Sequence, residues 1–86
     1  MPSHEDTLRQ QYTTLLSAFS AAFPNVTPPA PTWWLLWLGK YDVGDIHVAI
    51  ETLGRHELKD RFTQESTGRA ISSLLRQAAL REAVLS

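Results

Sequence analysis

Residues 24–40 read PNVTPPAPTWWLLWLGK, and this stretch decides how the rest of the chain folds. Its first nine residues, 24–32, hold four of the five prolines in the sequence. Because proline lacks an amide donor and fixes its own backbone angle, this segment cannot form a helix interior or a central strand. A flexible linker between domains would be richer in glycine and serine. We therefore predict a stiff, extended strap that crosses the surface of a single domain.

The second half of the stretch holds all three tryptophans of the chain. It predicts a short helix over residues 33–40 with Thr32 as its N-cap. A helix that is apolar nearly all round is buried on more than one side, which places this helix at the centre of the core. We expect the core residues to be Trp34, Trp37 and Leu38. Trp33 lies beside the strap and is the expected exception, which makes it a candidate stacking platform for bases or a candidate contact for a protein partner.

Hydrophobic periodicity outside this stretch predicts three more helices, so that the four helices cover residues of about 4–23, 33–40, 43–54 and 64–84. Pro24 ends the first, Gly54 ends the third, and Thr63 or Ser66 caps the last. No segment alternates between apolar and polar residues over the length of a strand. The chain, residues 1–86, is thus predicted to be one compact all-α domain of four helices, with a proline-rich crossover between the first two.

Composition limits the class of protein. The chain has 86 residues, a net charge of -1 and 43% hydrophobic residues, which excludes a disordered tail or a highly basic arm. Cysteine is absent, so there are no disulfides and no thiolate metal sites. The longest apolar run, residues 33–38, is far shorter than the roughly 20 residues that cross a bilayer. No signal sequence opens the chain, and we expect a cytoplasmic protein without a membrane partner.

Motifs for catalysis are missing from the sequence. His47 and Glu51 are four residues apart, as are His56 and Asp60, but a zinc site needs three or four ligands. The nucleophile elbow of hydrolases and the glycine-rich loops that bind phosphate or dinucleotides do not occur. We therefore expect neither catalytic residues nor a metal or other cofactor, and we predict that the protein is not an enzyme.

Charge is distributed unevenly along the chain. Residues 61–86 contain four arginines against two glutamates, whereas residues 42–60 contain five acids against two bases. On a helical wheel, Arg69, Ser72, Ser73 and Arg76 form a stripe opposite the apolar face of the last helix, and we select Arg69, Ser73 and Arg76 from it. Arginine forks and serine hydroxyls suit phosphate groups, so these three are candidate nucleic-acid contacts. The alternative is an ordinary solvated helix face.

Leu80 and Val84 lie on the same side of the last helix as the arginines. Branched apolar side chains on a solvent face indicate that something covers them. The first helix, the strap and a second copy of the chain are the candidates. We favour the second copy, and hence predict a homodimer through the last helix with Leu80 and Val84 as its contacts, while Trp33 is a separate candidate protein contact.

One longer stretch is similar to a known group of proteins. Residues 37–76, WLGKYDVGDIHVAIETLGRHELKDRFTQESTGRAISSLLR, resemble the helical domains of phage and plasmid replication accessory proteins, in particular the DnaD-like and helicase-loader-like groups. The matching residues are Trp37, Tyr41, Asp42, Ile46, Ala49, Ile50, Ile71, Leu74, Leu75 and Arg76. The resemblance implies an accessory module, of phage or mobile-element origin, that binds DNA or a replication protein. The alternative is a protein-binding or self-associating helical module without a nucleic-acid role.

Overall fold

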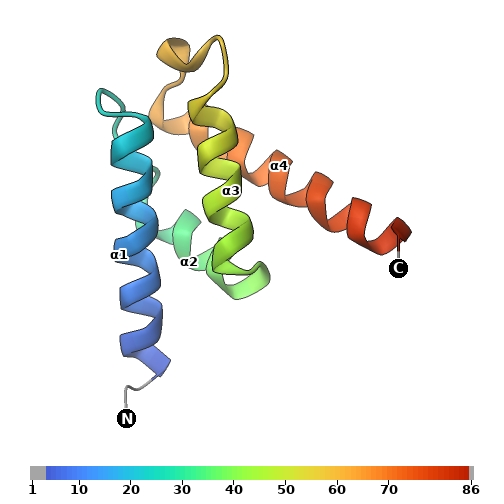
Figure 1. Ribbon diagram of the computed structural model, residues 1–86. Coiled ribbons are helices and arrows are strands. Elements are labelled where there is room, and N and C mark those ends of the chain that lie inside the picture. The colour runs from blue at the N-terminus through green and yellow to red at the C-terminus, as the bar shows by residue number, and fades with distance from the viewer. Residues whose placement is uncertain (1–3, 86) are drawn as a thin grey trace.

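The computed structural model describes residues 4–85 of the chain. These residues form four α-helices and no strand (Figure 1). The helices are α1 (His4–Ala22), α2 (Pro31–Lys40), α3 (Val43–Gly54) and α4 (Gln64–Leu85), and the short 3-10 helix η1 (Lys59–Arg61) precedes α4. The prediction of an all-α domain of four helices, with a proline-rich crossover between the first two, is confirmed.

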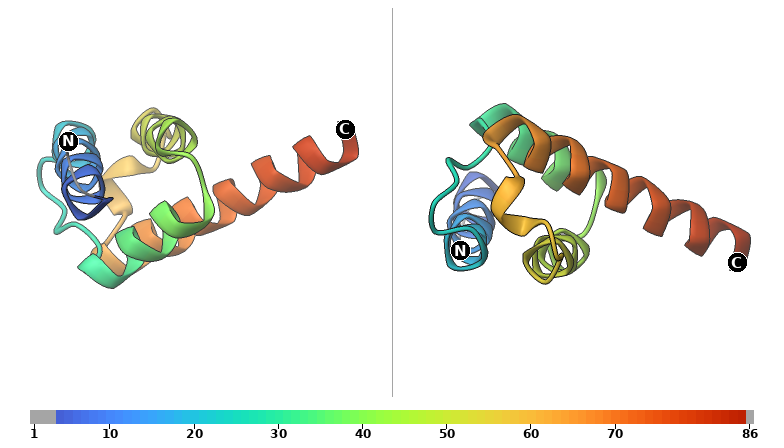
Figure 2. Two further views of the ribbon diagram at one scale, coloured as in Figure 1. Left: turned by 90° about the horizontal axis from the view of Figure 1, so that it is seen from below. Right: turned by 90° about the horizontal axis from the view of Figure 1, so that it is seen from above.

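The helices form two layers. α1 and α3 lie side by side in one layer, and α2 and the first half of α4 lie across them in the other (Figures 1 and 2). Ala22 and Gly54, at the ends of α1 and α3, almost touch: a Cβ atom at Gly54 would lie 3.0 Å from the Cβ of Ala22. Gly54 is followed by a residue in the right-handed helical region, so no left-handed turn requires it. This glycine permits a close helix contact as well as ending α3.

The strap between α1 and α2 is fixed to the body by two side chains. Trp34 Nε1 donates a buried hydrogen bond of 2.9 Å to the Pro29 carbonyl, and Gln64 Nε2 donates one of 3.0 Å to the Pro28 carbonyl. The prediction that Thr32 is the N-cap of α2 was wrong. The helix begins at Pro31, after an N-cap Ala30 that makes no side-chain capping bond. Proline suits the first helical turn, because that position needs no amide donor.

Buried aromatic rings from α1 and α2 make the centre of the core. The Trp34 ring meets Phe19 and Trp37 edge to face, at centroid distances of 5.9 and 5.1 Å. Such edge-to-face arrangements are the favoured geometry for aromatic pairs. The buried apolar residues are Leu15, Phe19, Phe23, Trp34, Trp37, Ile46, Ala49, Ile50, Leu53, Ile71 and Leu75. Trp34 and Trp37 are core residues as predicted, while Leu38 is only partly buried at the edge of the core.

The expectation that α2 is buried on several sides was wrong. Leu35 and Leu36 are 54% and 53% exposed, although they stand in the middle of an apolar run. α2 lies in the outer layer, so only the face that carries Trp34 and Trp37 turns toward the core. A chain of this length buries only roughly 60–65% of the surface of its unfolded form, which leaves too little protein to cover both sides of α2.

Candidate functional site

A groove runs between α2 and α4 and has a volume of about 410 Å³. Five of its lining residues come from α2 and the residue after it, and three come from α4: Trp33, Leu36, Trp37, Lys40, Tyr41, Arg69, Ser72 and Arg76. The groove therefore brings together residues that the sequence placed in two separate candidate sites. Trp33 was a candidate protein contact, and Arg69 and Arg76 were candidate nucleic-acid contacts.

The α2 wall of the groove follows from helical spacing. Trp33, Leu36 and Lys40 are three and four residues apart, so their side chains lie on one face of α2. The ring of Trp33 lies over Gly68 of α4: a Cβ atom there would be 3.4 Å from the ring. The glycine thus lets the indole approach the α4 backbone closely, and Trp33 is half-buried between the two helices.

Trp37 and Ser72 connect the two walls at the bottom of the groove. Trp37 Nε1 donates a hydrogen bond of 2.9 Å to Ser72 Oγ. This bond satisfies the only polar atom of a side chain that is 1% exposed. This part-buried hydrogen bond joins residues that are 35 positions apart in sequence, so it fixes α2 and α4 relative to each other, and with them the width of the groove.

The charges along the groove are all positive. Lys40 comes from α2 and Arg69 and Arg76 come from α4, and no aspartate or glutamate lines the groove. Arg69 Nη2 lies 2.6 Å from Glu65 Oε1, in a pair whose side chains are 73% and 72% exposed. Lys40 and Arg76 form no ion pair within the described part of the chain. The groove thus has two unpaired cations and a third that is weakly paired, which suits an anionic ligand.

Ser73 occupies a different position from the one that the helical wheel indicated. It is half-buried and does not line the groove, and its Oγ accepts a hydrogen bond of 3.3 Å from Gln77 Nε2. Ser72, another member of the predicted stripe, lines the groove beside the arginines instead. Lys40 and Leu36 also line the groove and were not predicted from the sequence. Their spacing from Trp33 could have identified them, but only once the groove-facing side of α2 was known.

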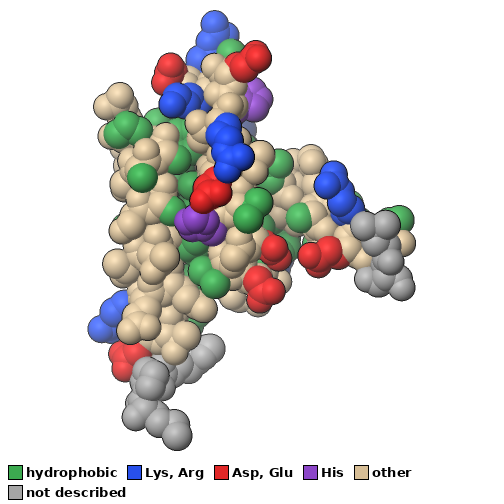
Figure 3. All heavy atoms as spheres, viewed as in Figure 1, with side chains coloured by type: hydrophobic (Ala, Val, Ile, Leu, Met, Phe, Trp, Pro, Cys, Tyr) green, Lys and Arg blue, Asp and Glu red, His purple; other side chains and the backbone are tan. Residues whose placement is uncertain are grey.

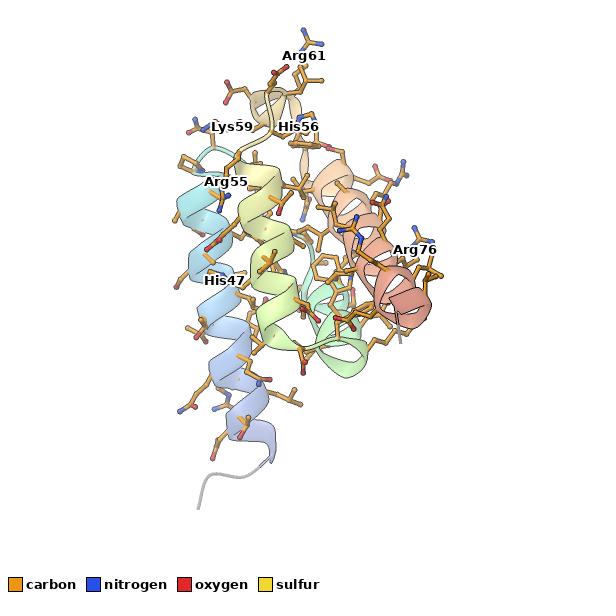
Figure 4. The ribbon with its side chains drawn as sticks, turned by 45° about the vertical axis from the view of Figure 1, so that its right-hand side comes forward. His47, Arg55, His56, Lys59, Arg61 and Arg76 are labelled. Atoms are coloured by element: carbon orange, nitrogen blue, oxygen red, sulfur yellow. The ribbon has the colours of Figure 1, made fainter. Side chains whose placement is uncertain are left out.

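A second group of basic residues does not line the groove. Figure 4 shows it near the end of α3 and η1, well away from Arg76: Arg55, His56, Lys59 and Arg61. Acidic side chains accompany it, because Glu57 and Asp60 belong to the same turn and Arg55 pairs with Glu51 at 3.3 Å. Blue and red spheres alternate there in Figure 3. This region has mixed charge, unlike the groove.

Leu80 and Val84 lie on the far end of α4, which extends away from the body (Figures 1 and 2). They are 66% and 83% exposed. Neither the first helix nor the strap covers them, so those two alternatives were wrong. A second copy of the chain stays a prediction.

His47 Nδ1 and Glu51 Oε1 lie 3.2 Å apart on α3, but no cluster of three or more metal-ligating side chains occurs in residues 4–85. Within the same range, no helix has the length and apolar character needed to cross a membrane.

Comparison of the chain with protein-family models, with curated proteins and with solved structures gave no match. The resemblance of residues 37–76 to replication accessory proteins therefore stays a prediction. The fold and the groove define a small all-α protein with a cationic, partly aromatic surface groove, and its function must be inferred from that groove.

Proposed function

We propose that the protein is a non-catalytic accessory module that binds nucleic acid in the groove between α2 and α4. One observation carries the proposal. Three cationic side chains, Lys40, Arg69 and Arg76, border a single groove from two different helices, and no acid lies among its lining residues. The resemblance to phage and plasmid replication proteins adds a role for such a module, in the replication of a phage or mobile element.

The lining residues fit the two parts of a nucleotide. Arg69 and Arg76 carry guanidinium forks that match phosphate oxygens, and Lys40 adds a compact positive charge. Trp33 and Leu36 provide apolar surface beside these cations, and aromatic surface in a cationic groove is typical of proteins that bind single strands. Because phosphate contacts carry no base information, we expect little sequence preference.

Three phosphate contacts make a weak and strongly salt-dependent site. Each phosphate contact on a single strand contributes about -0.7 to the slope of log affinity against log salt, so three give a slope of about -2. Affinity is then expected to fall roughly 20-fold between about 50 and 200 mM salt.

The test is a titration of a fluorescently labelled single-stranded oligonucleotide over this range of salt. Replacing Lys40, Arg69 or Arg76 by alanine should weaken binding and reduce the slope by about 0.7 each. Arg61→Ala is the matched control, because this cation lies well away from Arg76 and does not line the groove. No binding at the lowest salt, or an equal loss in Arg61→Ala, would refute the proposal.

A protein-binding module without a nucleic-acid role is the second candidate. The exposure of Leu36 in the groove favours it, since apolar, aromatic and arginine side chains together are typical of protein interfaces. The partner would then be an acidic segment with apolar anchors. Under this alternative the oligonucleotide titration fails at all salt concentrations, while Leu36→Glu abolishes binding of the protein partner.

A further inference from the structure

The last part of α4, residues 76–84, extends away from the body of the domain. Every residue from Arg76 to Val84 is exposed, and Figure 2 shows this end of the helix projecting well beyond the other elements. Most helical stability in proteins comes from packing of an apolar face, and this segment buries none of its residues. Two exposed branched side chains, Leu80 and Val84, add to the cost of leaving it uncovered.

A second apolar surface lies beside this projecting end. It is a groove between α3 and α4 with a volume of about 210 Å³. Its apolar lining includes Val48, which is 58% exposed, together with Ala49 and Leu74. Asp45 and Arg81 also line it, and neither forms an ion pair in the described part of the chain. The groove therefore offers apolar surface together with one unpaired charge of each sign.

We propose that the occupant of this surface is the α4 end of a second copy, bound about a two-fold axis. In such a dimer the two α4 helices run antiparallel, and each projecting end lies along the α3–α4 groove of the other copy. Leu80 and Val84 then cover Val48, and the partner's Arg81 faces Asp45. A two-fold axis repeats each contact, so one complementary pair of surfaces provides two identical contact regions.

A stable dimer needs a minimum area of contact. Stable complexes bury at least roughly 1,200 Å² in total, and two apolar side chains from each copy supply only part of that. The α3–α4 groove must supply the rest, which is why the proposal includes Val48 and Asp45. We expect a dimer that dissociates in the micromolar range and not an obligate one.

The dimer would also carry two copies of the cationic groove between α2 and α4. This consequence rests on the proposed function, whereas the dimer itself does not. Two linked sites bind a strand that spans both of them more tightly than either site binds alone. Affinity for a long oligonucleotide should then fall when dimerisation is lost, while affinity for one that fills a single groove should not.

The test is the molar mass in solution, measured by sedimentation equilibrium over a concentration series without nucleic acid. The mass should rise from 9.7 kDa toward twice that value as concentration increases. The Leu80→Glu/Val84→Glu variant should stay at 9.7 kDa with an unchanged thermal midpoint, since neither side chain is buried in the monomer. Leu35→Glu is the matched control, because Leu35 is also exposed and apolar but lies on α2, and it should dimerise normally.

The ion pair gives a second, independent readout. Asp45→Arg should weaken dimerisation by placing two arginines together, and Asp45→Arg combined with Arg81→Asp should restore it. A mass of 9.7 kDa at every concentration, a dimer that Leu80→Glu/Val84→Glu leaves intact, or equal loss in Leu35→Glu would each overturn the proposal. Because no nucleic acid is present, these outcomes leave the proposed function untouched.

Discussion

Trp37 is the residue on which both the core and the groove depend. Its ring packs edge to face against Trp34 at 5.1 Å, and its indole nitrogen donates to Ser72 across the groove. Trp33 lies 5.8 Å away, centroid to centroid, and lines the same groove. A single side chain thus holds α2 against α4 and supports the aromatic surface that we propose to bind nucleic acid.

Replacing Trp37 by alanine should cost about 3–5 kcal/mol of the free energy of unfolding, because it leaves a large cavity and an unpaired Ser72 hydroxyl. Such a loss is most of the stability of a small domain. Chemical denaturation monitored by circular dichroism measures it. Leu36→Ala is the control and should cost less than about 0.5 kcal/mol, since Leu36 is mostly exposed. Equal midpoints for the two variants would show that Trp37 is not a core residue.

At the scale of elements, the start of α4 depends on a reciprocal cap. The Ser66 amide donates to Thr63 Oγ1 at 3.2 Å, and the Thr63 amide donates to Ser66 Oγ at 2.7 Å. Two backbone donors that a helix start leaves unpaired are satisfied in this way. The sequence analysis named Thr63 or Ser66 as the cap, and the structure uses both. The cap fixes where α4 begins and therefore where Arg69 and Arg76 lie along the groove.

Thr63→Ala should lower the free energy of unfolding by about 1 kcal/mol, because the Ser66 amide loses its acceptor. The thermal midpoint should fall by about 4–8 °C, as expected for a domain of this size. The matched control is Thr27→Ala in the strap, where the exposed threonine side chain makes no hydrogen bond among the described residues. If Thr27→Ala lowers the midpoint as much as Thr63→Ala does, the cap does not stabilise α4.

At the scale of the whole molecule, the body and the projecting end of α4 are energetically distinct. The core ends at Leu75, and from Arg76 to Val84 every side chain is exposed. The molecule measures 41 × 33 × 18 Å, and Figure 2 shows that α4 accounts for much of its longest dimension. Folding of the body should therefore not require the projecting end.

A chain that stops after Gln77 should keep its fold, with a thermal midpoint within a few degrees of the complete chain at low concentration. Removing exposed residues costs little, because tolerance to truncation follows burial and not position in the sequence. Scanning calorimetry measures the midpoint, and sedimentation equilibrium of the same sample should show loss of the dimer. A truncated chain that fails to fold would contradict the division between body and projecting end.

Local patterns were sufficient to predict most of the fold. Periodicity placed α3 correctly at residues 43–54, and it placed the boundaries of α1 and α4 within one residue. The start of α2 was two residues late, because Pro31 was assigned to the strap instead of the first helical turn. Helix positions depend on residues three and four apart and on nearby caps, and the sequence displays both directly.

The candidate site was only partly predictable. The sequence alone identified Trp33, Arg69 and Arg76 as residues of interest, but it did not show that they line one groove, and it missed Lys40. It also could not show that Leu35 and Leu36 are exposed or that α4 leaves the body after Leu75. An apolar helix face is covered only where another element crosses it. That crossing is decided by packing between residues such as Trp37 and Ser72, which are 35 positions apart in the chain.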